Sequence, residues 1–201
     1  MALPLPRRLR PLWLLIPILL LAYAPLWLSQ QNPAPAPSLL IPYEFKPAFT
    51  LTDHNGVARS LQDFEGKLAI VYFGFTQCPD ICPVDLLLLS QALQKLQPVE
   101  LQKIQPLFIT IDPKNDNPQI IKTYLSSFHP SLLGLTGKPA QITQIAKNYG
   151  VFVKEEAHGE HGGEISHSAM FYVIDPVGKP LGAIRRSIDP EALARTIAAA
   201  L

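Results

Sequence analysis

One stretch of the sequence restricts the fold more than any other, because it places two thiols between a buried strand and a helix. Residues 68–75 form a run of apolar, β-branched and aromatic side chains, as expected of a central strand buried on both faces. Cys78 and Cys82, the two cysteines of the chain, follow at once, and each precedes a proline. A helix is predicted from Pro83 to Leu96, since proline is favoured at a first helical position. This order predicts an α/β domain with its site at the carboxyl end of a strand.

The chain after residue 45 alternates strand and helix patterns and then ends on paired strands. An Asn-Gly turn signal predicts a hairpin over residues 49–61. The other predicted strands cover residues 106–111, 151–153, 169–174 and 181–184, and the other predicted helices cover residues 118–128, 139–149 and 190–201. The polar, Gly-rich segment 154–168 is predicted to be a loop. Together these elements indicate a thioredoxin-like α/β fold, a mixed β-sheet flanked by helices, over residues 45–201.

The helix predicted at residues 83–96 has an apolar face. The residues that fall close to that face are Val84, Leu87, Leu88, Ala92 and Leu96. We expect this face to pack against the sheet.

Residues 1–28 predict an N-terminal transmembrane anchor. Three arginines among the first ten residues precede an uncharged, mostly apolar run over residues 11–28, about the length expected of a membrane-spanning helix. By the positive-inside rule the arginines stay in the cytoplasm and the rest of the chain is exported. Ala22-Tyr23-Ala24 has the form of a cleavage site, but Pro25 would follow the cut. We therefore favour a retained anchor in the cell inner membrane over a cleaved signal peptide, with the domain on the periplasmic-type side.

Residues 29–44 form a Pro-rich linker, which suits a semi-rigid spacer between the membrane and the domain. The formal net charge is +1, and the basic residues are scattered apart from the N-terminal cluster. The sequence thus offers no electrostatic basis for binding nucleic acid.

Three roles are open to the Cys78–Cys82 pair. The first is a structural disulfide in an oxidising compartment, although a bridge across so short a loop stabilises little. The second is a redox pair, although thioredoxin-type motifs have two residues between the cysteines and this chain has three. The third is a site for a soft metal such as Cu(I), which thiolates bind. Because a residue before proline is disfavoured in the α region, both thiols are predicted to lie in a loop just before the helix, whose dipole favours thiolates.

Two thiolates are an incomplete site for most metals, so a histidine is the natural third ligand. The five histidines of the chain are His54, His129, His158, His161 and His167. A lone histidine in a loop is more often solvated surface. His167 is favoured because it lies just before the strand predicted at 169–174, and a regular element holds an imidazole at a fixed distance. His158 and His161 are interpreted as solvated side chains, or at most as transient metal contacts.

The segment 74–83, Gly-Phe-Thr-Gln-Cys-Pro-Asp-Ile-Cys-Pro, closely resembles the signature of the Sco/SenC family of copper-binding assembly proteins. Residues 110–118, 166–168 and 172–178 fit the same family in order and approximate spacing. The resemblance spans nearly the whole domain. It implies a membrane-tethered, thioredoxin-like domain that binds one copper ion.

The resemblance also implies the ligands, which are Cys78, Cys82 and His167, for Cu(I), Cu(II) or both. Ser166 stands where the family often has aspartate, which removes a possible charge near the site without removing a ligand. Asp112 and Asp116 are placed beside the metal rather than among its ligands.

The function that the resemblance implies is that of a copper metallochaperone. Such a protein helps to assemble the Cu-A centre in subunit II of cytochrome c oxidase, as copper donor or as reductant of its cysteines. The alternative is an enzyme, a thiol–disulfide oxidoreductase, which needs neither histidine nor metal. A peroxidase is disfavoured because Phe75 stands where such enzymes place threonine. Donor and reductase use the same two thiols, so the sequence leaves that choice open, as it does the copper oxidation state and the oligomeric state.

Overall fold

The computed structural model describes residues 40–151, 153–156, 164–167, 170–185 and 189–201, with the segments 153–156 and 164–167 described by their backbone alone. The expected anchor at residues 1–28, most of the expected linker, and His158 and His161 lie outside these residues. Within the described part of the chain, no helix combines the length and the apolar character needed to cross a bilayer.

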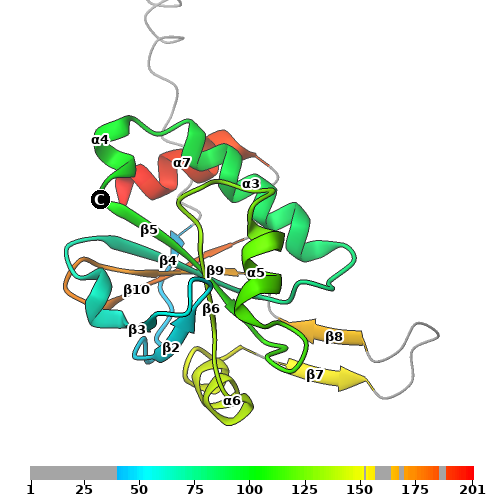
Figure 1. The fold of residues 1–201 in the computed structure, drawn as a ribbon. Helices are drawn as coiled ribbons and strands as arrows, with labels where there is room; N and C mark the ends of the chain where they lie inside the picture. Colours follow the sequence, from blue (N-terminus) through cyan, green and yellow to red (C-terminus); the bar gives the residue numbers. More distant parts are fainter. Residues whose placement is uncertain (1–39, 152, 157–163, 168–169, 186–188) are drawn as a thin grey trace, which may run out of the picture. The chain divides into compact units, whose positions relative to one another are not determined.

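A mixed eight-stranded sheet forms the centre of the domain, in the order β1-β10-β9-β4-β5-β6-β2-β3 (Figure 1). Its parallel strands are β4 (Leu68–Gly74), β5 (Ile104–Thr110) and β6 (Leu133–Thr136). Antiparallel strands complete both sides: β1 (Leu40–Ile41), β10 (Pro180–Arg185), β9 (Met170–Ile174), β2 (Thr50–Asp53) and β3 (Ala58–Ser60). All seven residues of β4 are buried, which confirms the prediction of a central strand.

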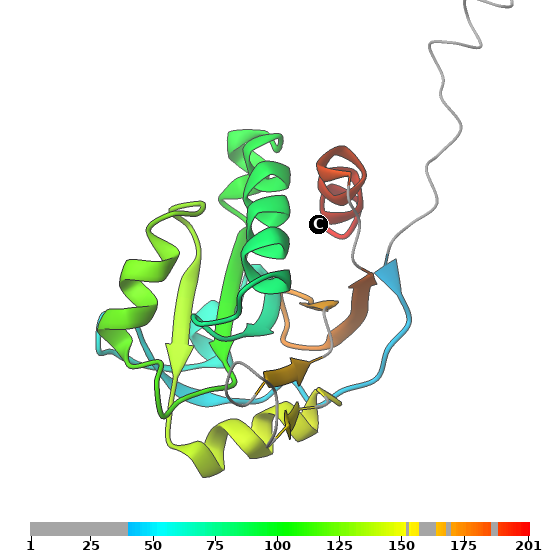
Figure 2. The same cartoon turned by 90° about the vertical axis from the view of Figure 1, so that its right-hand side faces the viewer.

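Helices cover both faces of this sheet (Figures 1 and 2). One face carries α3 (Ile81–Gln94), α5 (Pro118–Leu125) and α7 (Pro190–Ala199), and the other carries α6 (Pro139–Asn148). Two short helical turns, η2 (Leu61–Phe64) and α4 (Pro98–Leu101), complete the helical elements between residues 40 and 151. The layers confirm the predicted thioredoxin-like arrangement of a mixed sheet flanked by helices.

Alternation along β4 directs neighbouring side chains to the two faces. The Tyr72 hydroxyl donates to Asp85 of α3, at 3.1 Å. The ring of Phe73 packs against Tyr149, just after α6, with 5.0 Å between the ring centroids. The α3 face and the α6 face are therefore distinct environments, and the thiol site belongs to the α3 face.

A two-stranded antiparallel sheet lies where the sequence predicts a loop. It consists of β7 (Val153–Glu156) and β8 (Glu164–His167), with Val153 paired with His167. The prediction of a loop is wrong for residues 154–156 and 164–167. Both strands are mostly polar, and polar strands lack the alternation by which a strand is recognised. Residues 157–163 and 168 lie outside the described residues. The strand predicted at 151–153 begins at Val153 instead of ending there.

Two further strands were not predicted. β1 lies inside the segment assigned to the linker, and its Leu40 and Ile41 pair with Ile184 and Ala183 of β10. β6 is only four residues long and contains a glycine, so periodicity does not identify it. That glycine, Gly134, lets α5 approach closely, since a Cβ there would lie 2.1 Å from a methyl carbon of Ile121.

The helix after the thiol loop buries a different face from the predicted one. The buried residues of α3 are Cys82, Asp85, Leu86, Leu89, Ser90, Ala92 and Leu93. Val84 and Leu87, which we assigned to the core, are 38% and 51% exposed. The prediction is wrong for Val84 and Leu87, whereas Ala92 is buried as predicted. Four consecutive leucines, residues 86–89, surround the helix and fit more than one face.

Candidate metal centre

The two thiols lie on either side of the start of α3. Cys78 is half-buried in the loop after β4, whereas Cys82 is the second residue of the helix and is fully buried. The prediction that both precede the helix is therefore wrong for Cys82. Pro83 does not delay the helix, because an N–H in the first turn has no partner within the helix and its loss costs little there.

The Cys82 sulfur is held against the end of β4. A Cβ added at Gly74 would lie 3.0 Å from Cys82 Sγ and 2.9 Å from the ring of Phe108, so glycine is what admits the sulfur at this point. The Cys78 side chain lies within hydrogen-bond reach of Cys82, and both cysteines are thiols. The pair is thus close enough to share one metal ion or to form a disulfide.

Burial controls the acidity of the inner thiol. It raises the pKa of Cys82 to about 12 from an ordinary value of 9.0. The neighbouring Cys78 thiol adds to this rise in pKa, while hydrogen bonds from the Phe75 backbone and the Tyr72 hydroxyl oppose it. The expectation that the helix start favours a thiolate is wrong for Cys82, because loss of hydration outweighs the dipole.

The raised pKa of Cys82 predicts that the reduced, metal-free chain loses stability in alkali. The unfolded thiol ionises from about pH 9, whereas the folded one keeps its proton until about pH 12. The contribution of the Cys82 thiol to stability is fully present below pH 9 and is lost as the pH rises towards 12. The free energy of unfolding should therefore fall by about 1 kcal/mol between pH 8 and pH 9.5. Urea unfolding in the presence of a reductant measures it. Cys82→Ala is the control, and an equal fall in that variant would contradict the assignment.

A buried carboxyl group ties the thiol loop to the sheet. Asp116, which is fully buried, accepts hydrogen bonds from the backbone N–H of Thr76 at 3.0 Å and from the hydroxyls of Thr76 and Thr110. Its carbonyl oxygen accepts from the hydroxyl of Thr136 in β6, at 3.0 Å. Because Thr76 lies two residues before Cys78, Asp116 fixes the start of the thiol loop against β5 and β6.

The second acid predicted beside the metal has a different environment. Asp112 is half-buried, and its carboxyl group accepts from the exposed side chain of Asn115 at 2.8 Å. The structure therefore brings Asp116, rather than Asp112, to the thiol loop. Neither acid makes a hydrogen bond to a thiol within the described part of the chain.

Three polar side chains near the thiols were not identified as site residues from the sequence. Tyr72 and Asp85 are both buried and bonded to each other, and Tyr72 also contacts Cys82. The hydroxyl of Tyr124, on α5, is buried without a hydrogen-bond partner among the described residues. Only Asp85 had a usable signal: it stands three residues after Cys82 and therefore on the same side of the helix.

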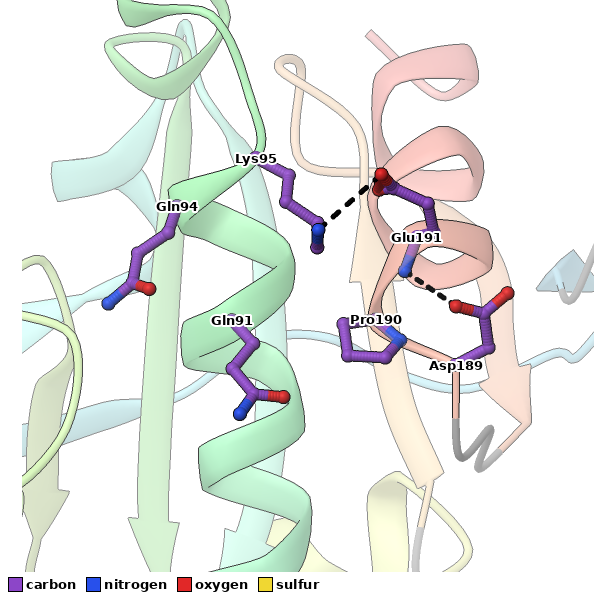
Figure 3. Close-up of a pocket in the computed structure, with 6 residues that line it drawn as sticks. All are labelled: Gln91, Gln94, Lys95, Asp189, Pro190 and Glu191. Atoms are coloured by element: carbon purple, nitrogen blue, oxygen red, sulfur yellow. Dashed lines mark hydrogen bonds and ion pairs between the residues drawn. The ribbon is translucent and has the colours of Figure 1, made fainter.

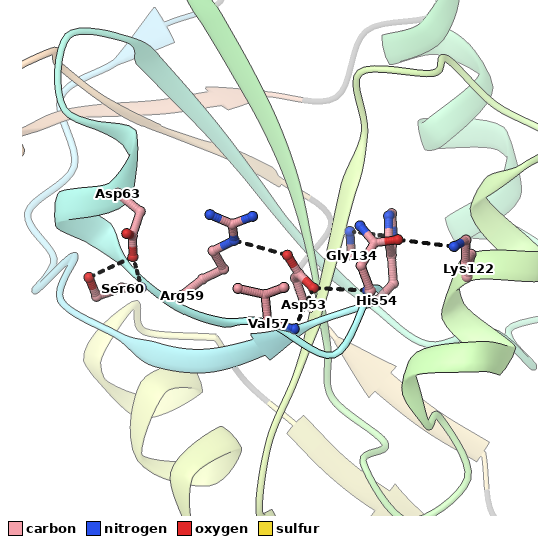
Figure 4. Close-up of polar contacts among 9 residues, drawn as sticks. Asp53, His54, Val57, Arg59, Ser60, Asp63, Lys122 and Gly134 are labelled. Carbon is pink, nitrogen blue, oxygen red and sulfur yellow. Dashed lines mark hydrogen bonds and ion pairs between the residues drawn. The ribbon is translucent and has the colours of Figure 1, made fainter.

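Two of the five histidines have structural roles elsewhere. His54 Nδ1 accepts the backbone N–H of Gly134 at 3.1 Å, beside the hairpin turn that Asp53 and Arg59 stabilise (Figure 4). The backbone N–H of His129 donates to the hydroxyl of Ser90 at 3.0 Å, and its ring contacts Ser131. No group of three histidine, cysteine or acidic side chains able to hold a metal occurs among the described residues.

His167 has a described backbone, at the end of β8, and its side chain lies outside the described residues. Antiparallel pairing joins Tyr72 of β4 to Phe171 of β9. The residues before Phe171 therefore meet the sheet at the same end at which the residues after Tyr72 leave it. This register places the segment containing His167 at the sheet end where the thiol loop begins.

The groove between α3 and α7 lies apart from this site (Figure 3). It is lined by Gln91, Gln94, Lys95, Asp189, Pro190 and Glu191, and Lys95 Nζ lies 3.4 Å from Glu191 Oε1. Lys95 is about 20 Å from Cys82 along the axis of the helix. The groove therefore contributes nothing to the thiol site.

Comparison with known proteins identifies relatives over the whole described domain. The family model for SCO1/SenC matches residues 40–201. "Protein SCO2, mitochondrial" of Saccharomyces cerevisiae is 41% identical over 145 residues, which cover 71% of this chain and 48% of the relative. "Protein sco1" of Schizosaccharomyces pombe is 39% identical over 153 residues, which cover 75% of this chain and 58% of the relative. This chain thus spans about half the length of these curated relatives.

Solved structures of related proteins have the same fold as this chain. ScoI of Bradyrhizobium japonicum with copper bound superposes with a TM-score of 0.70 at 34% identity, covering 79% of this chain and all of that one. Yeast Sco1 with copper bound gives a TM-score of 0.69 at 38% identity, covering 77% of this chain and 87% of that one. Both therefore share the thioredoxin-like fold described above.

Proposed function

This chain belongs to the SCO1/SenC family, and from that membership we propose that it is a copper metallochaperone. It binds one copper ion through Cys78, Cys82 and His167, and it helps to assemble the Cu-A centre in subunit II of cytochrome c oxidase. The observation that carries the proposal is the contact between the two thiols at the start of α3, in a domain whose solved relatives include copper-bound proteins.

The donor set suits copper. Two thiolates and an imidazole are soft and intermediate ligands that Cu(I) prefers and that Cu(II) also accepts. Binding requires both thiols to lose their protons, so copper must displace the proton that burial holds on Cys82. Binding also requires the reduced pair, so the Cys78–Cys82 redox state gates the site.

The unequal burial of the two thiols sets the order in which they release copper to a partner. Cys78 is half-buried and is the sulfur that a partner's thiol can replace first, whereas Cys82 is fully buried and releases the metal last. Stepwise replacement of one ligand at a time avoids releasing free copper ion into solution.

We also propose that residues 1–28 anchor the chain in the inner membrane and keep the domain on the exported side. The apolar run and the preceding arginines support this proposal. Because β1 begins at Leu40, the spacer between anchor and domain is shorter than the predicted 29–44 segment.

The second candidate function is a thiol–disulfide oxidoreductase, and the same unequal burial is what favours it. Cys78 would attack a partner disulfide, Cys82 would then displace the partner, and two electrons and two protons would pass to the partner as Cys78–Cys82 became a disulfide. The raised pKa of Cys82 opposes this reaction, because the second step needs the Cys82 thiolate. We therefore rank the chaperone first.

A transfer experiment separates the two functions. The reduced, copper-loaded full chain is mixed with an apo Cu-A domain whose cysteines are reduced, and copper on each protein is measured after separation. In parallel, the reduced, metal-free chain is mixed with the oxidised Cu-A domain, and new thiols on that domain are counted.

The chaperone predicts copper transfer that Cys82→Ala abolishes, with little reduction of the partner. Rapid reduction of the partner without copper transfer would reverse the ranking.

A further inference from the structure

Tyr124 has a buried hydroxyl with no hydrogen-bond partner among the described residues. Such a group costs stability, because it loses its hydrogen bonds to water without gaining any in the protein. Phenylalanine would fill the same space without that cost. A buried, unpartnered hydroxyl next to a binding site therefore calls for a partner that is added when the site is used.

Ring contacts place Tyr124 beside the thiols. Its ring packs against Phe108, with 5.9 Å between the centroids. The ring edge of Phe108 and the Cys82 sulfur meet at the same point above Gly74, at 2.9 and 3.0 Å from the position of a Cβ there. Burial raises the pKa of Tyr124, and the proximity of Cys82 and then Cys78, whose ionised forms carry negative charge, raises it further. Phe108, Tyr124 and the two thiols thus share one region of the α3 face.

The neighbouring hydroxyl is not equivalent. Tyr72 has a single proton, and its hydroxyl shares that proton between the buried carboxyl group of Asp85 and the sulfur of Cys82. If Tyr72 turned this proton towards sulfur, the Asp85 carboxyl would lose a hydrogen bond, which is costly in a buried site. Tyr124 donates to nothing in the described part of the chain, so its proton is available without such a loss.

A protonated thiol and a metal-bound sulfur differ strongly as acceptors. A thiol is a weak acceptor, whereas a sulfur that has lost its proton carries negative charge and accepts hydrogen bonds strongly. A donor held beside the pair therefore gains most when copper has replaced the protons.

We propose that Tyr124 is a positioning residue for copper, whose hydroxyl donates a hydrogen bond to a copper-bound sulfur of the Cys78–Cys82 pair. The inference rests on the proposed copper binding and adds a group that orients a ligand sulfur and stabilises its charge. In the copper-loaded state this hydrogen bond would also offset the stability that is lost without metal, where the buried Tyr124 hydroxyl has no partner among the described residues.

The test compares Tyr124→Phe with a matched control, Tyr172→Phe. Tyr172 carries the other buried hydroxyl without a partner in the described part of the chain. Its ring packs against Phe73 and Tyr149 on the α6 face, with 5.7 and 5.3 Å between the centroids. Both variants remove the same group from a buried site, and only Tyr124 lies near the thiols.

Three measurements are made on the full chain: thermal stability without metal, Cu(I) affinity by competition with a chelator, and the sulfur-to-Cu(II) charge-transfer spectrum. Tyr124→Phe should be at least as stable as wild type, should bind Cu(I) about tenfold more weakly, and should shift the charge-transfer band. Tyr172→Phe should change neither copper measurement. Resonance Raman spectra of the wild-type chain in D2O supply a measurement without mutation, since a hydrogen bond to sulfur makes the copper–sulfur frequency isotope-sensitive.

Wild-type affinity and an unshifted band in Tyr124→Phe would overturn the positioning role while leaving copper binding intact. The same holds if Tyr172→Phe weakens binding equally, since the effect would then not be local. If the wild-type chain binds no copper, the proposed function fails and this inference fails with it.

Discussion

Replacing Cys78, Cys82 or His167 by alanine is expected to weaken Cu(I) binding by the reduced chain by more than about 100-fold in each case. Loss of a group that only orients a ligand typically costs 10- to 100-fold in metal affinity, and loss of a ligand should cost more. Competition with a Cu(I) chelator measures the affinity. The charge-transfer spectrum of the Cu(II) form reports which sulfurs remain bound.

His158→Ala is the matched control for His167→Ala, because it removes an imidazole from the same part of the chain. It should bind copper as wild type does. If His167→Ala also bound copper as tightly as wild type, the site would consist of the two thiolates without this histidine. Equal weakening by both histidine variants would instead indicate a ligand set shared between them.

Asp116→Ala is expected to lower the free energy of unfolding by about 3–5 kcal/mol, the usual cost of breaking a buried hydrogen-bond network. The substitution leaves the backbone N–H of Thr76 and the hydroxyls of Thr76 and Thr110 without their acceptor. No lysine or arginine among the described residues pairs with Asp116, so these hydrogen bonds are what the carboxyl group contributes. Urea unfolding of the reduced, metal-free chain measures the loss.

Asp112→Ala is the control for this prediction. Asp112 is a nearby acid in the same turn, but its carboxyl group has an exposed partner, so its removal should cost less than about 1 kcal/mol. A similar loss in both variants would show that the turn tolerates neither change and that Asp116 has no special role in fixing the thiol loop.

The elements that were predicted correctly are those whose signal is local. The buried run of β4 and the Asn-Gly hairpin between β2 and β3 are readable because apolar content and turn chemistry act over a few residues. β7 and β8 were missed because their pairing depends on a partner strand, and a polar strand does not show its partner in its own sequence.

The site divides in the same way. The spacing of Cys78 and Cys82 identifies two thiols at a strand end from the sequence alone. Their different burial follows from the start of α3 at Ile81. The sequence predicts a later start, at Pro83, because proline is favoured at a first helical position and disfavours helix at the residue before it. Asp85 and Tyr124 come to the thiols from separate helices, so no spacing in the sequence relates both of them to the pair.

The order of the amino acids alone predicts the fold class, the two-thiol loop, the family resemblance and the histidine to test. The tertiary structure decided how those residues behave. It placed Cys82 where burial outweighs the helix dipole, bound the loop to β5 through Asp116, and left the Tyr124 hydroxyl of α5, beside the thiols, without a partner among the described residues. Burial and hydrogen-bond partners arise from residues that are distant along the chain, and only packing brings such residues together.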